Sequence, residues 1–442
     1  MANTFLTKTF ASDSNRKIWT WSAWIKRSGL GGTQTLMTQV DGWNGNGNAG
    51  FYIIGDQLTS YNFTASLNSG TSSYNRPSMF LRDVNGWYHI VVRLDTTQST
   101  ASDRCRWYVN GEQLTDFAYA NYPSLNQDCN FNGGDPHGIG SHTAGANYFD
   151  GTMSYINFSD GYSYAPTVFG STDSTTGEWT INTNPTFTLG THGFTILKNG
   201  NTITDQSTNS NNWSLGGGTL TKTEDCPDNV FATINGLNSW GTAVLTNGNL
   251  TVEDTGTTAG RFFATIHMNK GKWYMEFNVD THLNSYTAPS FLLAGTGAFQ
   301  LAQIGFTSSG DGSFGMSSNG RVITDGAESA VVIPALVNND KVQIAYDADA
   351  GKAWFGINGT YFNSGNPTTA ANPYFTSTKL QNNDVVFVSI GYDGNKMSAN
   401  FGNGYFGTTA VSSAGTNASD NGIFEYDVPT GFTALSTKGL NL

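Results

Sequence analysis

Alternation of side chains with a period of two is the feature that most constrains the fold of this chain. In the stretch WTWSAWIKRSG (19–29), tryptophan and alanine alternate with threonine and serine. Similar alternation runs through GWYHIVVRLDTT (86–97) and GKWYMEFNVD (271–280). Successive side chains of a strand point to opposite faces, so each stretch predicts a strand with one apolar face. We expect no helix of ordinary length.

Turn residues separate these stretches and indicate antiparallel pairing. The pairs Asn110-Gly111 and Asn358-Gly359 are typical of two-residue hairpin turns, whose central positions need positive φ. Glycine is abundant, at 53 of 442 residues. Many short strands joined by polar turns predict an all-β chain of antiparallel β-sandwich, or jelly-roll, domains.

The density of strand signals along the chain predicts four parts. We expect a first sandwich over 1–165 and a second over 246–408. Residues 166–245 are polar and rich in turn residues, which predicts an irregular connector with short hairpins. Residues 409–442 are expected to form a C-terminal extension.

Charge and composition narrow the classes of function. Charged residues are 12% of the chain and the formal net charge is −12, which argues against nucleic-acid binding. No apolar run is long enough for a membrane span, and we expect no membrane insertion. Three cysteines do not make a disulfide framework, and the start of the chain has no signal-peptide pattern. We therefore expect synthesis in a reducing cytoplasm.

Four stretches of the first sandwich resemble LamG domains of the concanavalin A-like class. They are WTWSAWIKRS (19–28), GWYHIVVRLDTT (86–97), RWYVNGE (106–112) and YFDGTMSYINFSDG (148–161). The second sandwich resembles a SPRY domain in GKWYMEFNV (271–279), QIGF (303–306), VQIAYDADAGKAWFGING (342–359) and VVFVSIGYDG (385–394). The resemblance implies two concanavalin A-like sandwiches in tandem.

The tandem itself is similar to structural proteins of tailed bacteriophages, especially marine ones. The segment 149–170, the stretch CPDNVFATIN (226–235) and the closing DVPTGFTALSTKGLNL (427–442) carry this likeness. It implies a virion protein of the tail or capsid surface, assembled in the host cytoplasm beside other virion proteins. It also implies a homo-oligomer, a trimer if the protein is a fibre.

Three functions fit this reading. The first is non-enzymatic attachment to a host-surface glycan, and the second is a purely structural role as capsid decoration or tail subunit. The third, a glycan-cleaving depolymerase, needs paired carboxylates. The nearest pair, Glu276 and Asp280, lies four residues apart on one strand, and we expect both to be solvated. We therefore predict no catalytic residues and no enzyme.

Aromatic residues in loops are the candidates for stacking on sugar rings. In the first sandwich these are Trp43, Tyr74 and Tyr148. In the second, the stretch GDGSFGMSSNGRVITDG (310–326) predicts a long polar loop, with Phe314 and Arg321 as anchors for a partner. For each of these residues, ordinary packing against the sheet is the alternative to ligand binding.

Two further groups of residues have both a functional and a structural interpretation. Trp19 and Trp21 alternate with small polar residues, which favours the core of the sandwich over an exposed platform. Trp24 lies on the opposite face. Asp135 and Asp150 are candidate Ca²⁺ ligands in a glycine-rich region, although turn chemistry alone explains both. We expect no other cofactor.

Overall fold

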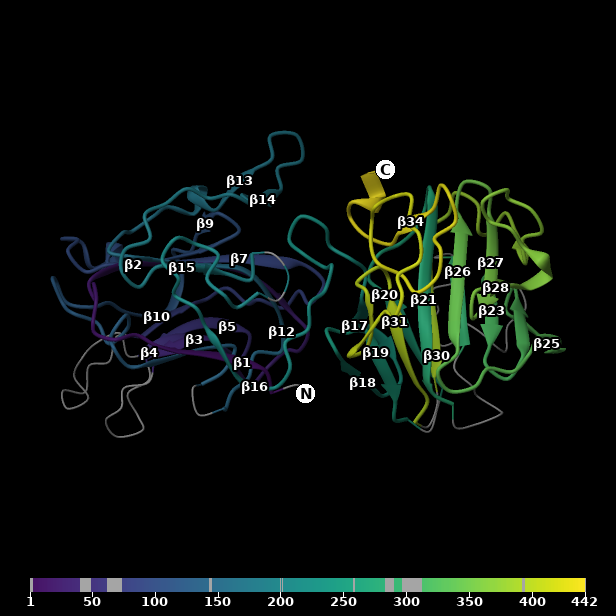
Figure 1. The fold of residues 1–442 in the computed structure, drawn as a ribbon, viewed down its shortest axis with the longest axis horizontal. Helices are drawn as coiled ribbons and strands as arrows, with labels where there is room; N and C mark the ends of the chain where they lie inside the picture. The colour runs from purple at the N-terminus through teal and green to yellow at the C-terminus, as the bar shows by residue number, and fades with distance from the viewer. Residues whose placement is uncertain are drawn as a thin grey trace. The chain divides into compact units, whose positions relative to one another are not determined.

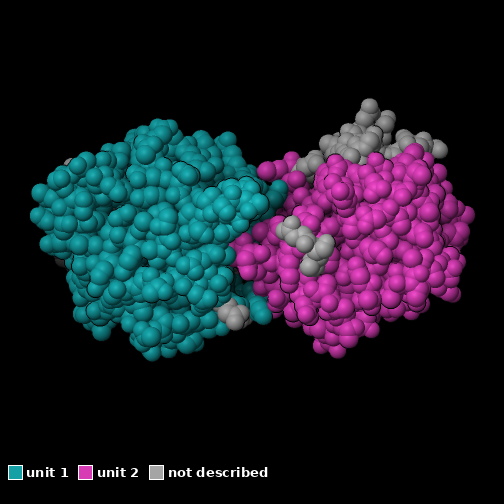
Figure 2. Space-filling model, turned by 90° about the horizontal axis from the view of Figure 1, so that it is seen from above, with its two compact units in different colours: residues 1–222 teal, residues 223–442 magenta. Residues whose placement is uncertain are grey.

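The computed structural model describes residues 3–39, 49–61, 74–142, 145–198, 200, 202–256, 259–282, 290–295, 312–391 and 394–441. The chain divides into two compact units, Met1–Lys222 and Thr223–Leu442, coloured separately in Figure 2. The division falls inside the predicted connector, so residues 166–245 are shared between the two units and do not form a separate unit. Both units are built from β-sheets whose strands pair antiparallel, as the alternation predicts, except for the parallel pair of β34 (Thr433–Ala434) and β21 (Lys272–Thr281).

The first unit is a sandwich of two sheets, which Figure 1 shows as two layers. The eight-stranded sheet has the order β10-β6-β5-β4-β3-β11-β1-β16. Its strands are β1 (Phe5–Thr9), β3 (Thr33–Gln39), β4 (Ala49–Ile54), β5 (Gln57–Tyr61), β6 (Tyr74–Pro77), β10 (Phe117–Asn121), β11 (Pro136–Ile139) and β16 (Ser214–Gly217).

The six-stranded sheet has the order β15-β12-β2-β7-β8-β9. Its strands are β2 (Ile18–Arg27), β7 (Trp87–Asp95), β8 (Cys105–Val109), β9 (Glu112–Gln113), β12 (Gly151–Asp160) and β15 (Phe194–Ile196). A separate hairpin consists of β13 (Gly170–Thr172) and β14 (Trp179–Ile181). Short 3₁₀ turns lie at η1 (Ala101–Asp103) and η2 (Pro166–Val168).

Tryptophans of the opening stretch fill the core of this sandwich. Trp19 and Trp21 are fully buried and pack with Phe51 of the facing sheet. The prediction that they are core residues is confirmed. Trp24 points to the other face of β2 and is also buried, stacked on His89 with 4.8 Å between ring centroids.

The second unit also pairs two large sheets. The seven-stranded sheet runs β17-β20-β30-β22-β23-β24-β25, and the other β18-β19-β31-β21-β26-β27-β28, with β29 on β27 and β34 on β21. The first contains β17 (Ile234–Trp240), β20 (Gly260–Ala264), β22 (Ser290–Gly295), β23 (Ser313–Ser317), β24 (Arg321–Thr324), β25 (Ala327–Val331) and β30 (Val385–Gly391).

The other sheet contains β18 (Ala243–Thr246), β19 (Thr251–Asp254), β21 (Lys272–Thr281), β26 (Lys341–Asp347), β27 (Lys352–Ile357), β28 (Thr360–Tyr361), β29 (Phe375–Thr376), β31 (Lys396–Asn400) and β34 (Thr433–Ala434). A small hairpin, β32 (Tyr405–Phe406) with β33 (Thr409–Ala410), and the 3₁₀ turns η4 (Phe362–Ser364) and η5 (Gly439–Asn441) complete the unit. No helix in the described part of the chain has the length and apolarity to cross a membrane.

Segments expected to lie outside the sandwiches are integral to them. β15 pairs with β12 and β16 pairs with β1, although both strands lie in the predicted connector. The C-terminal residues cover the face of β21 that points away from the core, where Phe424 and Phe432 pack with Tyr274 and Trp354. Figure 1 shows this segment in yellow beside β21. Each such strand is too short to stand out in a polar stretch.

Candidate functional site

One face of the eight-stranded sheet points away from the core of the first unit, and we call it the outer face. In β4, Phe51 and Ile53 are fully buried in the core, so Tyr52 between them points to the outer face. Phe51 is paired with Ser60, and Ser60 with Asn75. These pairings fix which residues of β5 and β6 lie on the core side and which lie on the outer face.

The strand register aligns outer-face residues into a continuous line across five strands. Tyr52 of β4 lies opposite Thr35 of β3 and Thr59 of β5. Arg76 of β6 lies opposite Tyr119 of β10. Because Ser60 pairs with Asn75, Thr59 lies beside Arg76. We call this line the outer row; its members are Thr35, Tyr52, Thr59, Arg76 and Tyr119.

The outer row changes from buried to exposed along its length. Thr35 and Thr59 are fully buried, whereas Tyr119 is 60% exposed on β10, the end strand of the sheet. Tyr74 lies two residues from Arg76 on β6, and its ring meets that of Tyr119 edge to face at 5.4 Å. The accessible part of the outer face therefore presents two tyrosines and an arginine. Arg76 lies two residues from Tyr74 on β6 and opposite Tyr119 on β10.

An open hollow lies where β6 ends and β10 begins. It has a volume of about 380 Å³, within the range of ligand sites. The backbone N–H of Ser78 donates to the carbonyl of Asp116 at 3.0 Å and holds its two walls together. Hydroxyl, amide and carboxylate groups mix there with apolar side chains; the lining residues are Ser78, Met79, Gln113, Leu114, Thr115 and Asp116.

The structure places two of the three stacking candidates of the first unit on the outer face. Tyr74 forms the pair just described, and Tyr148 contacts Phe5 with 6.0 Å between ring centroids. Phe5 shares the outer face because its neighbour Leu6 points into the core. Trp43 lies outside the described residues. Tyr119, which the sequence reasoning missed, lies in a stretch FAYAN whose alternation is too short to mark a strand.

Of the two candidates of the second unit, Phe314 is buried, whereas the side chain of Arg321 is 40% exposed. In the described part of 310–326, β23 and β24 pair as a hairpin, so the prediction of a long loop was wrong there. Phe314 is only 4% exposed and belongs to the core. Arg321 donates to Glu328 at 2.7 Å. In β23, Ser and Gly alternate with Phe and Met, and in the sequence these small residues are typical of a loop.

The candidate metal ligands Asp135 and Asp150 have separate surroundings. Asp135 accepts a hydrogen bond from Gln39 at 3.3 Å. Burial raises the pKa of Asp150 even though the positive charge of Arg27 opposes this. Among the residues that the structure describes, no three His, Cys, Asp or Glu side chains gather as a metal site. A Ca²⁺ ion bound by either aspartate stays a prediction.

The carboxylates considered for glycan cleavage differ from expectation. Glu276 is fully buried, so the prediction of a solvated side chain was wrong for it. Its carboxylate accepts hydrogen bonds from the backbone N–H groups of Glu425 and Tyr426 and from the hydroxyl of Tyr274. Burial raises its pKa to about 7. Asp280 instead accepts from Asn278 and Ser398. These contacts show Glu276 anchoring the C-terminal segment.

A serine and a histidine also meet, on the outer side of the six-stranded sheet. His89 Nε2 lies 2.9 Å from Ser22 Oγ, and Trp179 Nε1 donates to His89 Nδ1 at 3.0 Å. An indole nitrogen only donates, so Nδ1 accepts and the ring proton sits on Nε2, facing Ser22. Burial lowers the pKa of His89 to about 3. In this tautomer His89 cannot take the serine proton as a base.

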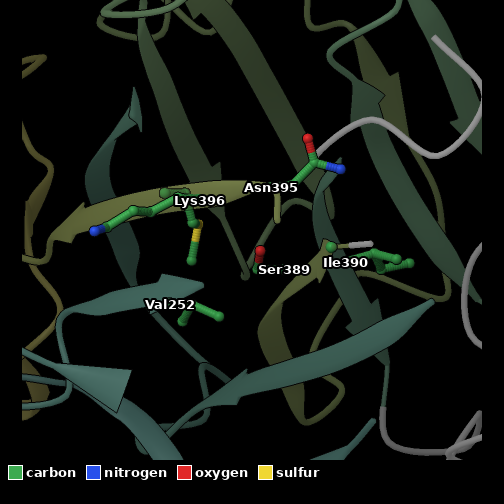
Figure 3. Close-up of a pocket in the computed structure, with 7 residues that line it drawn as sticks. Val252, Ser389, Ile390, Asn395 and Lys396 are labelled. Carbon is green, nitrogen blue, oxygen red and sulfur yellow. The ribbon is translucent and has the colours of Figure 1, made fainter. Parts of the chain in front are cut away.

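A smaller cavity lies in the second unit, between β30, β31 and β19 (Figure 3). Its volume of about 10 Å³ is enough for roughly one water molecule. Val252, Ser389 and Lys396 are among the residues that line it. A space of this size cannot hold a sugar.

Comparison with known proteins agrees with this architecture. Residues 4–162 match a family model described as the concanavalin A-like lectin/glucanases superfamily (Laminin_G_3). A search of curated protein sequences found no match to this chain.

Solved structures with detectable similarity include two SPRY domains and a pentraxin. The SPRY domain of human HERC1 is 12% identical, with 38% of this chain and 96% of that chain covered and a TM-score of 0.30. The TRIM65 PSpry domain is 13% identical, with 38% and 91% covered and a TM-score of 0.28. A heptameric SAP-like pentraxin from Limulus polyphemus is 16% identical, with 37% and 72% covered and a TM-score of 0.27. TM-scores this low carry no functional argument. The match of residues 4–162 to the concanavalin A-like lectin/glucanases superfamily is consistent with carbohydrate binding.

Proposed function

We propose that this protein is a non-enzymatic virion protein of a tailed bacteriophage that attaches to a host-surface glycan through the outer face. One observation carries the glycan part: the contact between half-buried Tyr74 and exposed Tyr119 on the outer face of a concanavalin A-like domain, whose strands β6 and β10 also flank the hollow. Sugars present apolar C–H faces that lie flat on aromatic rings. Hydroxyl, amide and carboxylate groups of the hollow suit the sugar hydroxyls.

The virion part of the proposal rests on the sequence resemblance of the tandem. In this proposal the protein lies on the tail or capsid surface, is assembled in the host cytoplasm, and contacts other virion proteins. It forms a homo-oligomer, because virion appendages are built by symmetry, and a trimer if it is a fibre.

The two groups best suited to act in catalysis are both in unsuitable surroundings, which supports a non-enzymatic function. His89 faces Ser22 with its proton-bearing nitrogen, and Glu276 is enclosed by the C-terminal segment. A glycan-cleaving depolymerase remains the minor alternative. Release of reducing sugar that disappears with a single carboxylate substitution would establish that alternative.

Substitution of Tyr119 tests the glycan proposal. The full chain is applied to a glycan array, and the best-bound glycan is titrated against the wild type and Tyr119→Ala. We expect about a fivefold loss of affinity, since one stacking contact is worth about 1 kcal/mol. Tyr162→Ala is the matched control, because Tyr162 is 44% exposed beyond the end of β12, in the other sheet. Equal losses in both variants would contradict the proposal.

Antibody-gold labelling of intact particles tests the virion part. Antibodies to either unit are expected to label tail fibres or tail tips. Absence of label from every particle would refute the virion assignment.

A structural role as capsid decoration or tail subunit is the second candidate. An apolar segment at the edge strand β25 favours it, because Val331, Val332 and Val337 are 62%, 59% and 63% exposed. Exposed apolar patches mark protein–protein contacts. Even gold label over the capsid, together with no bound glycan, would support this role over attachment.

A further inference from the structure

We infer that the glycan is acidic and that Arg76 on the outer face binds its carboxylate or sulfate group. This inference rests on the proposed glycan binding and names the class of sugar. It concerns the accessible end of the outer row, where Arg76 and Tyr119 are paired across β6 and β10.

Arg76 lacks a negative partner. Its Nη2 donates to the carbonyl of Ile54 at 2.9 Å, and its Nε is enclosed without an acceptor. It forms no ion pair with any described residue. In the same unit Arg27 pairs with Asp56 at 3.1 Å and Arg106 with Asp103 at 2.8 Å, whereas Arg93 and Arg104, like Arg76, donate to uncharged oxygens. A half-buried guanidinium without a counter-charge is costly unless a ligand supplies one.

The strand neighbours of Arg76 are uncharged. Tyr119 lies directly opposite, Thr59 lies beside it on β5, and Tyr74 lies two residues away on the same face. No carboxylate belongs to the outer row. The net charge of the whole chain is −12. An anion that reaches this point meets a local positive charge.

The chemistry of the side chains selects the type of anion. A guanidinium presents a planar fork of N–H donors that fits the oxygens of carboxylate and sulfate groups. The rings of Tyr74 and Tyr119, which contact each other, offer apolar faces to a sugar ring. A sugar that carries its acid group on the ring satisfies both at once, whereas a neutral sugar leaves the guanidinium unpaired.

Matched acidic and neutral polymers test the inference with the full chain. The carboxylate arm compares oligogalacturonate with its methyl ester, and the sulfate arm compares dextran sulfate with dextran. We expect one acidic member to bind about tenfold more tightly than its neutral counterpart, the usual effect of a charge-assisted hydrogen bond. The arm that shows the preference identifies the anion.

Variants separate a specific contact from general attraction. Arg76→Gln is expected to abolish the preference, and Arg76→Lys, which keeps the charge without the fork, to retain only part of it. Arg106→Gln, on β8 in the other sheet, is expected to leave it unchanged. Unchanged melting temperatures of the Arg76 variants would show that both are folded.

The outcomes distinguish a failure of the acidic-glycan inference from a failure of the proposed glycan binding. If the neutral member binds as tightly as the acid and Tyr119→Ala weakens both, the inference is overturned while glycan binding stands. Acid binding that survives Arg76→Gln also overturns it, because attraction then comes from elsewhere. If no polymer binds and the glycan array is empty as well, the proposed glycan attachment itself fails.

Discussion

Glu276 accepts a hydrogen bond from the backbone N–H of Glu425 at 2.8 Å, across 149 positions of sequence. A second N–H, from Tyr426, binds the same carboxylate at 2.9 Å. A buried side chain of β21 thereby holds the C-terminal segment against the rest of the second unit. The aromatic cluster around Phe424 and Phe432 completes this attachment.

The stability of the second unit is expected to fall as pH rises from about 4.5 to about 7. Burial raises the pKa of Glu276 to about 7 in the folded state, above its ordinary value of 4.5. The folded state therefore binds the proton more tightly, and this contribution is lost as pH passes through the folded pKa. The loss is on the order of 3 kcal/mol. Calorimetry of the full chain between pH 4 and 8 measures it.

Glu276→Gln provides the control for this pH dependence. The amide does not titrate, so the unfolding transition of the second unit should lose most of its slope over the same range. A slope that is unchanged in this variant would show that another group carries the effect.

The first unit is expected to show the opposite pH dependence. Burial lowers the pKa of both His89 and His137 to about 3. The unfolded histidines bind protons below about pH 6.5, so the stability present above that value is lost as pH falls toward 3. The two unfolding transitions should therefore move in opposite directions over about pH 4.5 to 6.5. His89→Gln should reduce the slope of the first transition alone.

Truncation of Phe424 is expected to destabilise the second unit strongly. The side chain is 1% exposed and packs edge to face on Tyr274, with 4.9 Å between ring centroids. Phe424→Ala should cost about 3–5 kcal/mol, the usual effect of a large cavity. The neighbouring Ile423 is 37% exposed, so Ile423→Ala should cost less than about 1 kcal/mol. Denaturant unfolding compares the two, and equal costs would contradict the packing described.

Gly111 is expected to tolerate no side chain. Its φ is +82°, and an added Cβ would lie 2.4 Å from the ring of Trp179. Gly31 has a similar φ of +75° with nothing within 4 Å, so it isolates the backbone cost. Gly31→Ala should cost about 1–2 kcal/mol, and Gly111→Ala clearly more. Thermal unfolding of the first unit measures both, and equal losses would rule out the contact with Trp179.

The sequence predicted the parts of the fold whose side chains alternate in long strands. Trp19 and Trp21 were assigned to the core because large and small polar residues alternate strictly around them. Phe314 was misassigned because the glycine and serines around it imitate a loop. Burial of such a short strand depends on partners distant in sequence, here the neighbouring strand β22.

The candidate site could be predicted only in part for the same reason. Tyr74 and Tyr148 stood out as aromatics in polar stretches, but nothing local shows that they share a face. The pairing of β6 with β10 brings Tyr119 beside Tyr74 and Arg76. The buried position of Glu276 likewise depends on a segment 149 residues away.

The pairing of β16 with β1 sets the order in which the first unit is completed during synthesis. β1 leaves the ribosome well before β16, so one of its edges finds its partner only after Gly217 has been made. β12 waits similarly for β15. A fragment cut at residue 162, where the family match ends, would expose both strand edges. Open edges invite pairing between molecules, so such a fragment should aggregate where one ending at Lys222 stays monodisperse.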